Sequence, residues 1–416
     1  MKLFWQRIAE VNESEVVGRL SAKTIAFLYR WLVDESGRSI FEGLEAFSAS
    51  LGMTKEAGRK AINELVAVDL VVKEKRQFSA PQKYHLRSSF SCDESDKSES
   101  NIPFQIAHCL VSNRASYPSY ISRLGSWIEE SKIGLTKRVL LSALLSLSTT
   151  NGFVLGVSQT RLSLITGIPQ RSVKLYLKEF KKAGAIVLYP GLFRKGGFGH
   201  TSSMIAIKLE NVIEGGLVTI FRTGGAIDDH GWKFSKGNIF LSPPFHSALG
   251  SSAVWELYLK IMFESPDDLR MRSNQHAQYF DLLARYVAST LICVRDLPEA
   301  GDALGLTGQI VGLLPSLPEL KGKDGWASEN AELCAQVRGE LDCHNLTDED
   351  VLRYAVAALI VLVGTELARL VRSLYERDSE FSKFMFKSEA ELNWWVRLSK
   401  YRGVECIYFC RVAPPQ

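Results

Sequence analysis

The chain has 416 residues, of which 46% are hydrophobic and 23% are charged, and this composition excludes a fibrous or intrinsically disordered protein. The formal net charge of +4 conceals an uneven distribution, because residues 132–208 carry 12 basic and 1 acidic side chains while residues 209–416 carry 21 basic and 28 acidic ones. An excess of positive charge confined to one segment is the pattern expected of a surface that contacts nucleic acid.

No secretion or membrane signal is recognisable in the sequence. The N-terminal residues lack a sustained apolar core followed by a small-residue cleavage site. The most apolar run, Ala355–Val363, is shorter than the roughly 18–20 residues that a membrane span needs, so we interpret it as a buried core helix or, alternatively, a dimer-forming helix. The seven cysteines have no framework spacing, which is typical of a reducing compartment. We therefore expect a cytoplasmic protein that does not associate with a membrane.

Residues 1–87 are predicted to form the first folded unit. Apolar residues at helical spacing, followed by alternating ones, predict three helices and a hairpin at Ala22–Val33, Leu44–Leu51, Thr54–Val68 and Leu70–Leu86. Residues 88–102 follow as an acidic, serine-rich linker, because so polar a segment cannot bury enough apolar surface to become ordered.

Residues 103–213 are predicted to form a second unit with the same order of elements. Its first helix is Thr136–Leu147, opened by its capping threonine, and its short second helix is Ser158–Thr166, with Ser158 as its N-cap. Gly167–Pro169 forms a turn, because glycine tolerates a positive φ and proline can begin a helix. A third helix runs from about Gln170 to Ala183, and Gly184 supplies its C-cap. A hairpin with a glycine-rich tip completes the order of a winged helix-turn-helix domain.

The two units match each other when the sequence is shifted by 115 residues without a gap. The shift places Gly52 on Gly167 and Glu64 on Glu179, and apolar positions stay in phase for about 35 residues. We interpret this match as an internal duplication of one supersecondary unit.

The third helix of the second unit has two chemically distinct faces. At about 100° per residue, Val173, Tyr176, Leu177 and Phe180 gather on one side and the basic residues on the other. A helix of this width fits the DNA major groove, so we expect base contacts from its first residues, backbone contacts from its later lysines and further contacts from the wing. These residues are Gln170, Arg171, Ser172, Lys174, Lys178, Lys181, Lys182, Arg194, Lys195 and His200. The alternative is a solvated helix face, although such faces usually mix both charges.

The first unit has a weaker set of basic residues. Those expected to contact DNA are Lys55, Arg59, Asn63, Lys75 and Arg76. Glu56 and Glu64 dilute the charge of its third helix, so this unit is alternatively a structural or protein-binding copy.

Together these features resemble the winged helix-turn-helix of bacterial transcription regulators and of phage and plasmid replication proteins. The resemblance rests on the apolar first helix, the Asn151-Gly152 connection, the turn sequence ITGIP at Ile165–Pro169 and the exit sequence AGAI at Ala183–Ile186. It covers about 75 residues of the second unit well and about 70 of the first less well. It implies binding of double-stranded DNA, and tandem copies are similar to those of initiators encoded by mobile genetic elements.

Residues 217–416 are predicted to form an all-helical domain. Its candidate helices are Ser252–Phe263, Ser273–Val294, Glu329–Leu341, Asp348–Arg377 and Ser388–Tyr401, with a loop region at Asp296–Ser328 and a candidate strand at Val404–Val412. Only one pair of cysteines, Cys406 and Cys410, has the spacing found in zinc sites, which usually need two such pairs. Neither a nucleophile elbow nor a kinase signature is present. We therefore expect no metal, no cofactor and no enzymatic activity.

The expected fold class is mainly α with small β-hairpin wings, comprising two winged helix-turn-helix domains and an all-helical C-terminal domain. The expected partners are double-stranded DNA and, through residues 217–416, a second copy of the chain or another protein. A transcription regulator is the favoured function. The alternatives left open are a replication initiator of a plasmid, phage or integrative element, and a winged-helix scaffold subunit of a larger assembly.

Overall fold

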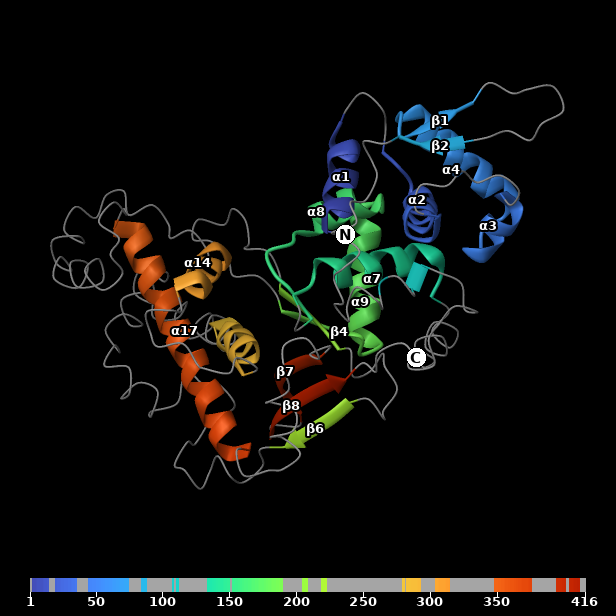
Figure 1. The fold of residues 1–416 in the computed structure, drawn as a ribbon. Coiled ribbons are helices and arrows are strands. Elements are labelled where there is room, and N and C mark those ends of the chain that lie inside the picture. The colour runs from blue at the N-terminus through green and yellow to red at the C-terminus, as the bar shows by residue number, and fades with distance from the viewer. Residues whose placement is uncertain are drawn as a thin grey trace.

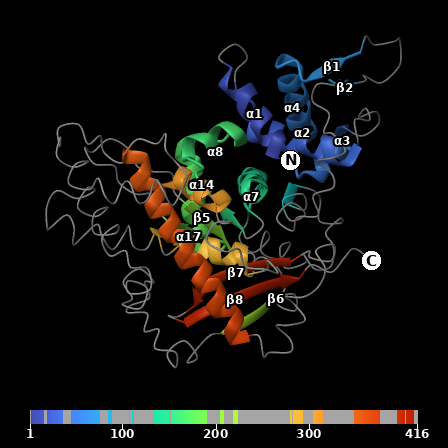
Figure 2. The same cartoon turned by 60° about the vertical axis from the view of Figure 1, so that its left-hand side comes forward.

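The computed structural model describes residues 2–14, 19–35, 44–74, 84–87, 107, 110–111, 133–149, 152–189, 204–208, 218–222, 279–280, 282–292, 304–314, 348–375, 394–401 and 404–411. Within these residues the chain is mainly helical, with small antiparallel sheets (Figures 1 and 2). This confirms the coarse prediction of a mainly α protein that carries small β-hairpins.

The first unit contains the three predicted helices, the predicted hairpin and an additional N-terminal helix. Its elements are α1 (Lys2–Glu13), α2 (Ala22–Glu35), α3 (Leu44–Ser50), α4 (Lys55–Ala67), β1 (Val71–Lys73) and β2 (Tyr84–Leu86). The two strands are antiparallel, with Val71 opposite Leu86. Thr54 fixes the start of α4, because its hydroxyl accepts a hydrogen bond from the Ala57 amide at 3.2 Å.

The second unit contains the predicted helices and hairpin strands, together with a short strand between its first two helices. Its elements are α7 (Leu135–Leu147), β3 (Phe153–Val154), α8 (Gln159–Thr166), α9 (Gln170–Lys182), β4 (Ile186–Tyr189) and β5 (Met204–Ile207). The strands form an antiparallel sheet in the order β3-β5-β4. The predicted capping by Thr136 is wrong, because α7 begins one residue earlier and its N-cap is Gly134, which has no side chain to accept a hydrogen bond.

The backbone repeats with the predicted offset. α4 and α9 each have 13 residues, and they start 115 positions apart. Gly52 and Gly167 precede these helices with φ angles of 71° and 62°. Asp69 and Gly184 follow them with φ angles of 59° and 73°. A non-glycine residue in the left-handed region is uncommon, so the matching positions indicate that the same local fold forms twice.

The two units pack against each other reciprocally. α2 contacts α7, which is the equivalent first helix of the other unit. Arg138 in the first turn of α7 donates a hydrogen bond from Nη2 to the carbonyl of Leu51, just after α3, at 3.2 Å. In the other direction, Gly167 just after α8 lies against the carbonyl of Leu20 and the side chain of Ile25 in the first turn of α2. Contacts made in both directions between equivalent surfaces are characteristic of an approximate twofold relation.

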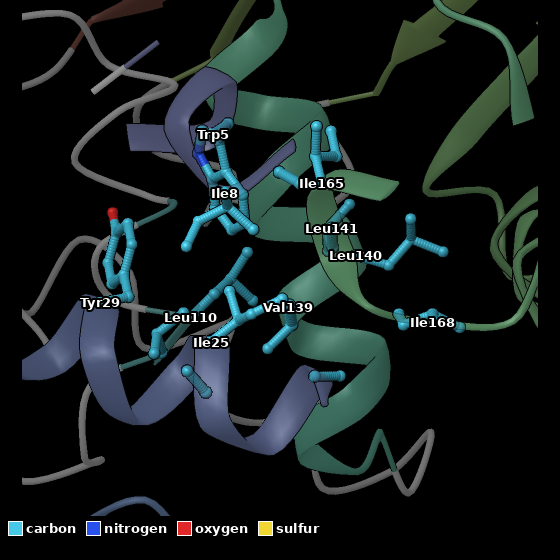
Figure 3. Packing of buried hydrophobic residues seen from close by; sticks show 14 of the residues in the cluster. Trp5, Ile8, Ile25, Tyr29, Leu110, Val139, Leu140, Leu141, Ile165 and Ile168 are labelled. Carbon is cyan, nitrogen blue, oxygen red and sulfur yellow. The ribbon is translucent and has the colours of Figure 1, made fainter. Parts of the chain in front are cut away.

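One hydrophobic core runs through both units. Its buried residues extend from Phe4 in α1 to Ile207 in β5, and Figure 3 shows side chains of α1, α2, α7 and α8 meeting in it. Asn12 of α1 joins the units directly, since Nδ2 donates to the Leu164 carbonyl at 2.6 Å and Oδ1 accepts from the Leu20 amide at 2.7 Å. The predicted linker at 88–102 lies outside the described residues, so the division into domains stays a prediction.

The C-terminal part contains a sheet, so the prediction of an all-helical domain is wrong. β6 (Val218–Arg222), β7 (Trp394–Tyr401) and β8 (Val404–Arg411) are antiparallel in the order β6-β8-β7. β7 occupies the second half of the helix predicted at Ser388–Tyr401, whereas the predicted terminal strand is confirmed. All eight residues of β7 pair with β8 across a connection of only two residues. Such a nearby pairing partner favours the strand over a helix of similar apolar content.

Two further elements of the C-terminal part are α14 (Leu304–Leu313) and α17 (Asp348–Tyr375), which pack side by side (Figures 1 and 2). α17 and the helical residues 282–291 confirm two of the predicted helices. α14 lies in the region predicted as a loop, so that prediction is wrong for these residues. The three glycines of α14 weaken the helical signal in its sequence. The helices predicted at Ser252–Phe263 and Glu329–Leu341 lie outside the described residues.

The apolar run of α17 is largely buried, as predicted. Val356, Ile360 and Val363 are buried, whereas Leu362 is 36% exposed. Of the helices that the structure describes, none combines the length and the apolar character that crossing a membrane requires.

The C-terminal helices also cover the sheet of the second unit. All four residues of β5 are buried, so both faces of this sheet are covered. Ile205 and Ile207 belong to the shared core on one face. Phe153 of β3 lies against Tyr286, with ring centroids 5.6 Å apart in an edge-to-face arrangement. The sheet is therefore held between the shared core and the C-terminal part.

Gly364 in α17 is expected to be intolerant of a side chain. An added Cβ would lie 2.6 Å from Cβ of Val287 and 2.7 Å from the carbonyl oxygen of Ala284. Gly364→Ala is therefore expected to lower the free energy of unfolding by about 1–3 kcal/mol through overpacking, although alanine favours helix. Gly308→Ala in α14 is the control: its added Cβ meets nothing within 4 Å, and a gain of about 0.5–1 kcal/mol is expected. Urea denaturation measures both, and unchanged stability of Gly364→Ala would contradict this packing.

Candidate nucleic-acid interface

The orientation of α9 is determined by the side chains that it buries. Val173, Leu177 and Phe180 are buried in the shared core, and Tyr176 is partly buried against it. These residues recur every three or four positions, so they form one stripe along the helix. The predicted apolar face is therefore confirmed, and the opposite side of α9 points away from the core.

The opposite side of α9 is a row of exposed basic residues, which we call the basic face. It consists of Arg171, Lys174, Lys178, Lys181 and Lys182. Within the described part of the chain, none of these five side chains forms an ion pair. Several uncompensated charges on one helix face create a positive potential that attracts polyanions.

Glu179, the one acidic residue of α9, is held at the side of the helix. Its Oε2 lies 2.6 Å from Nζ of Lys137 in α7, and the same ammonium group is 5.4 Å from the ring centroid of Tyr176. The ion pair compensates the negative charge of α9 without using a residue of the basic face. Sequence analysis does not identify Lys137, because no local pattern connects it to a residue 42 positions later.

The turn before α9 is fixed by short-range hydrogen bonds. The hydroxyl of Ser163 donates to the carbonyl of Ile168 at 2.6 Å, and that of Thr166 donates to the carbonyl of Leu162 at 2.5 Å. Gln170 Nε2 donates to the hydroxyl of Thr160 at 3.2 Å, so this exposed predicted site residue also links α9 to α8. Ser172, the remaining predicted site residue of α9, is partly exposed.

The equivalent surface of α4 is less basic than the basic face. Lys55 pairs with Glu45 of α3 at 2.5 Å between Nζ and Oε2, so its charge is partly compensated. The hydrogen bond and charge of Lys55, with a smaller contribution from Arg59, hold the pKa of Glu45 below its usual value. Arg59 and Asn63 are exposed, whereas Glu56 adds an exposed negative charge. The structure therefore brings Lys55, Arg59 and Asn63 onto one helix with a small net charge.

Glu64, the second acidic residue expected to dilute the charge of α4, is held against the first turn of α2. Its carboxylate accepts hydrogen bonds from the Ser21 amide at 3.1 Å and from the Thr24 hydroxyl. These groups belong to the first turn of α2, where a carboxylate is stabilised by the unpaired helix amides. Glu64 and Glu179 are equivalent in the repeat, so in both units this position ties the third helix to the first.

The remaining predicted site residues, Lys75, Arg76, Arg194, Lys195 and His200, lie outside the described residues. Among the residues that are described, no three His, Cys, Asp or Glu side chains are arranged to hold a metal ion. Comparisons with protein-family models and with curated proteins found no match to this chain.

Proposed function

We propose that this chain binds double-stranded DNA, with α9 lying in a major groove. The observation that carries the proposal is the basic face: five exposed basic residues lie on a helix whose other side is buried and whose one carboxylate is paired with Lys137. An ordinary solvated helix face usually mixes both signs of charge. A helix with one uncompensated positive face is instead complementary to the phosphates that line a groove.

The element order around α9 supports the same proposal. α7, β3, α8, α9, β4 and β5 follow the order of a winged helix-turn-helix domain, in which the third helix enters the groove. Arg171 stands at the start of α9, where such helices contact bases, and a guanidinium can donate two hydrogen bonds to guanine. Lys178, Lys181 and Lys182 stand further along and would neutralise phosphates.

The reciprocal packing of the two units favours a target with two parts. Related recognition helices normally read related half-sites, so α4 and α9 would contact two halves of one target. The halves would differ in sequence, because α4 carries Glu56 at the position where α9 carries Arg171. A transcription regulator bound to an imperfect inverted repeat is the function that we favour. Two half-sites of different sequence would also suit a replication initiator. In a footprinting experiment, an initiator would protect an array of repeats in the DNA.

We further propose that the C-terminal part binds a second copy of the chain or a partner protein. It is the acidic part of the sequence, with 28 acidic and 21 basic residues between positions 209 and 416, so it is not suited to DNA contact. Size-exclusion chromatography with light scattering of the full chain separates these two partners: a dimeric mass supports self-association.

The proposal is tested by selecting duplexes from a random library and measuring their affinity for single variants. Arg171→Ala is expected to weaken the selected site by about 1–3 kcal/mol and to relax preference at one base pair. Lys181→Ala is expected to weaken all duplexes alike. If about 6 phosphates are contacted, the wild-type log–log salt slope is about −5, and loss of Lys181 makes it shallower by about 0.9. Failure to enrich any duplex, or full affinity in both variants, would rule out this function.

A further inference from the structure

Leu175 is an apolar residue on the basic face. It is 54% exposed, and it is the large hydrophobic side chain of α9 that the core does not cover. It follows Arg171 by four positions and precedes Lys178 by three, so all three side chains lie on the same side of the helix. An exposed leucine forfeits the free energy that burial would provide, so its position raises the question of what covers it.

The surroundings of Leu175 are those of a nucleic-acid contact and not of a protein interface. The centre of a protein interface is depleted in charged residues and forms a continuous apolar patch. The residues three and four positions from Leu175 on the helix surface are Arg171, Ser172, Lys178 and Glu179. Arg171 and Lys178 are exposed cations, and the charge of Glu179 is paired with Lys137. The charge around it is complementary to phosphate, so the occupant that fits this surface is DNA.

We propose that Leu175 contacts the C5-methyl group of a thymine, and this inference rests on the proposed function. The thymine methyl is the apolar group that standard base pairs present in the major groove, and apolar side chains recognise it by direct contact. Leu175 lies one helical turn beyond Arg171, so it would reach a base near the one that Arg171 reads. Lys178 and Lys182, one and two turns further along, would hold the adjacent phosphates.

The repeat makes the inference specific to one half of the target. Shifting the sequence by 115 positions places Leu175 on Lys60, which is exposed on α4. An ammonium group donates hydrogen bonds and cannot recognise a methyl group by apolar contact. The half-site read by α9 therefore requires a thymine that the half-site read by α4 does not.

The test uses the duplex enriched by the full chain, with each thymine replaced in turn by deoxyuridine, which lacks the methyl group. At one position in the half contacted by α9, the substitution is expected to weaken binding about fourfold, the loss that corresponds to one buried methyl group. With Leu175→Ala the same substitution is expected to change nothing. Leu175→Lys, which copies Lys60, is expected to lose the thymine preference while making the salt slope steeper by about 0.9.

Each result decides the inference. If the wild-type chain binds every deoxyuridine duplex equally well, the inference is overturned. It is also overturned if the loss of affinity caused by deoxyuridine persists in Leu175→Ala, because the methyl contact then belongs to another residue. Circular dichroism melting checks that Leu175→Ala folds, which is expected because alanine is a good helix former. If no duplex is enriched at all, the proposed function itself fails, and this outcome is distinct from a duplex that binds without a thymine preference.

Discussion

Replacing Gly167 with alanine is expected to lower the free energy of unfolding by about 3–5 kcal/mol, because two separate costs add. The first cost is conformational, since φ is 62° and an L-residue in this region costs about 1–2 kcal/mol. The second is steric, because an added Cβ would lie 2.0 Å from the carbonyl oxygen of Leu20. Leu20 cannot move freely, since its amide is bonded to the buried side chain of Asn12, which also bonds to Leu164.

The repeat provides a matched control for this substitution. Gly52 is the equivalent residue of the first unit, with φ of 71°, and the nearest atom to an added Cβ is Nη2 of Arg138 at 3.7 Å. Gly52→Ala should therefore cost only the conformational term of about 1–2 kcal/mol. Urea unfolding of both variants measures the difference. Equal losses would mean that the turn of the second unit does not pack on Leu20, and the shared core of the two units would have to be rejected.

Local signals predict the part of the fold that carries the basic face. Ser158 is predicted to cap α8, and its hydroxyl accepts a hydrogen bond from the Arg161 amide at 3.0 Å. Gly167 and Gly184 are predicted at positions that need a positive φ, and both adopt one. Caps, turns and helical periodicity depend on residues within a few positions of each other, so one sequence is sufficient to identify them.

Long-range contacts account for what sequence analysis does not predict. The hydrogen bond from Asn12 to the Leu164 carbonyl joins residues 152 positions apart, and it belongs to a helix, α1, that is not predicted at all. Glu64 shows the same limit for charge, because sequence analysis counts its negative charge on α4 but does not identify its hydrogen-bond partners, Ser21 and Thr24. The strand β7 is a third case, because its partner β8 determines its conformation. Periodicity within a segment carries no information about such partners.

The largest effect on DNA affinity is expected from removing Lys178 and Lys182 together. These residues are four positions apart on the basic face, and both are exposed and form no ion pair within the described part of the chain. Lys178→Gln with Lys182→Gln preserves helix propensity while removing two positive charges. At about 0.9 per phosphate, the log–log salt slope should change from about −5 to about −3, and affinity at low salt should fall on the order of tenfold to a hundredfold.

A second double variant separates a local contact from the effect of net charge. Arg19 and Lys23 are also four positions apart and exposed, but they belong to the segment that begins α2. Arg19→Gln with Lys23→Gln removes the same charge from residues outside α9. If only charges that contact phosphate contribute to the slope, this variant should remain near −5. Filter binding or fluorescence anisotropy at several salt concentrations gives both slopes.

If the two variants lose affinity equally, attraction is a property of the whole chain, and α9 has no special position against the DNA. If only the variant in α9 has a shallower slope, its lysines release counterions from phosphates that they touch, which requires that the basic face lie against the duplex.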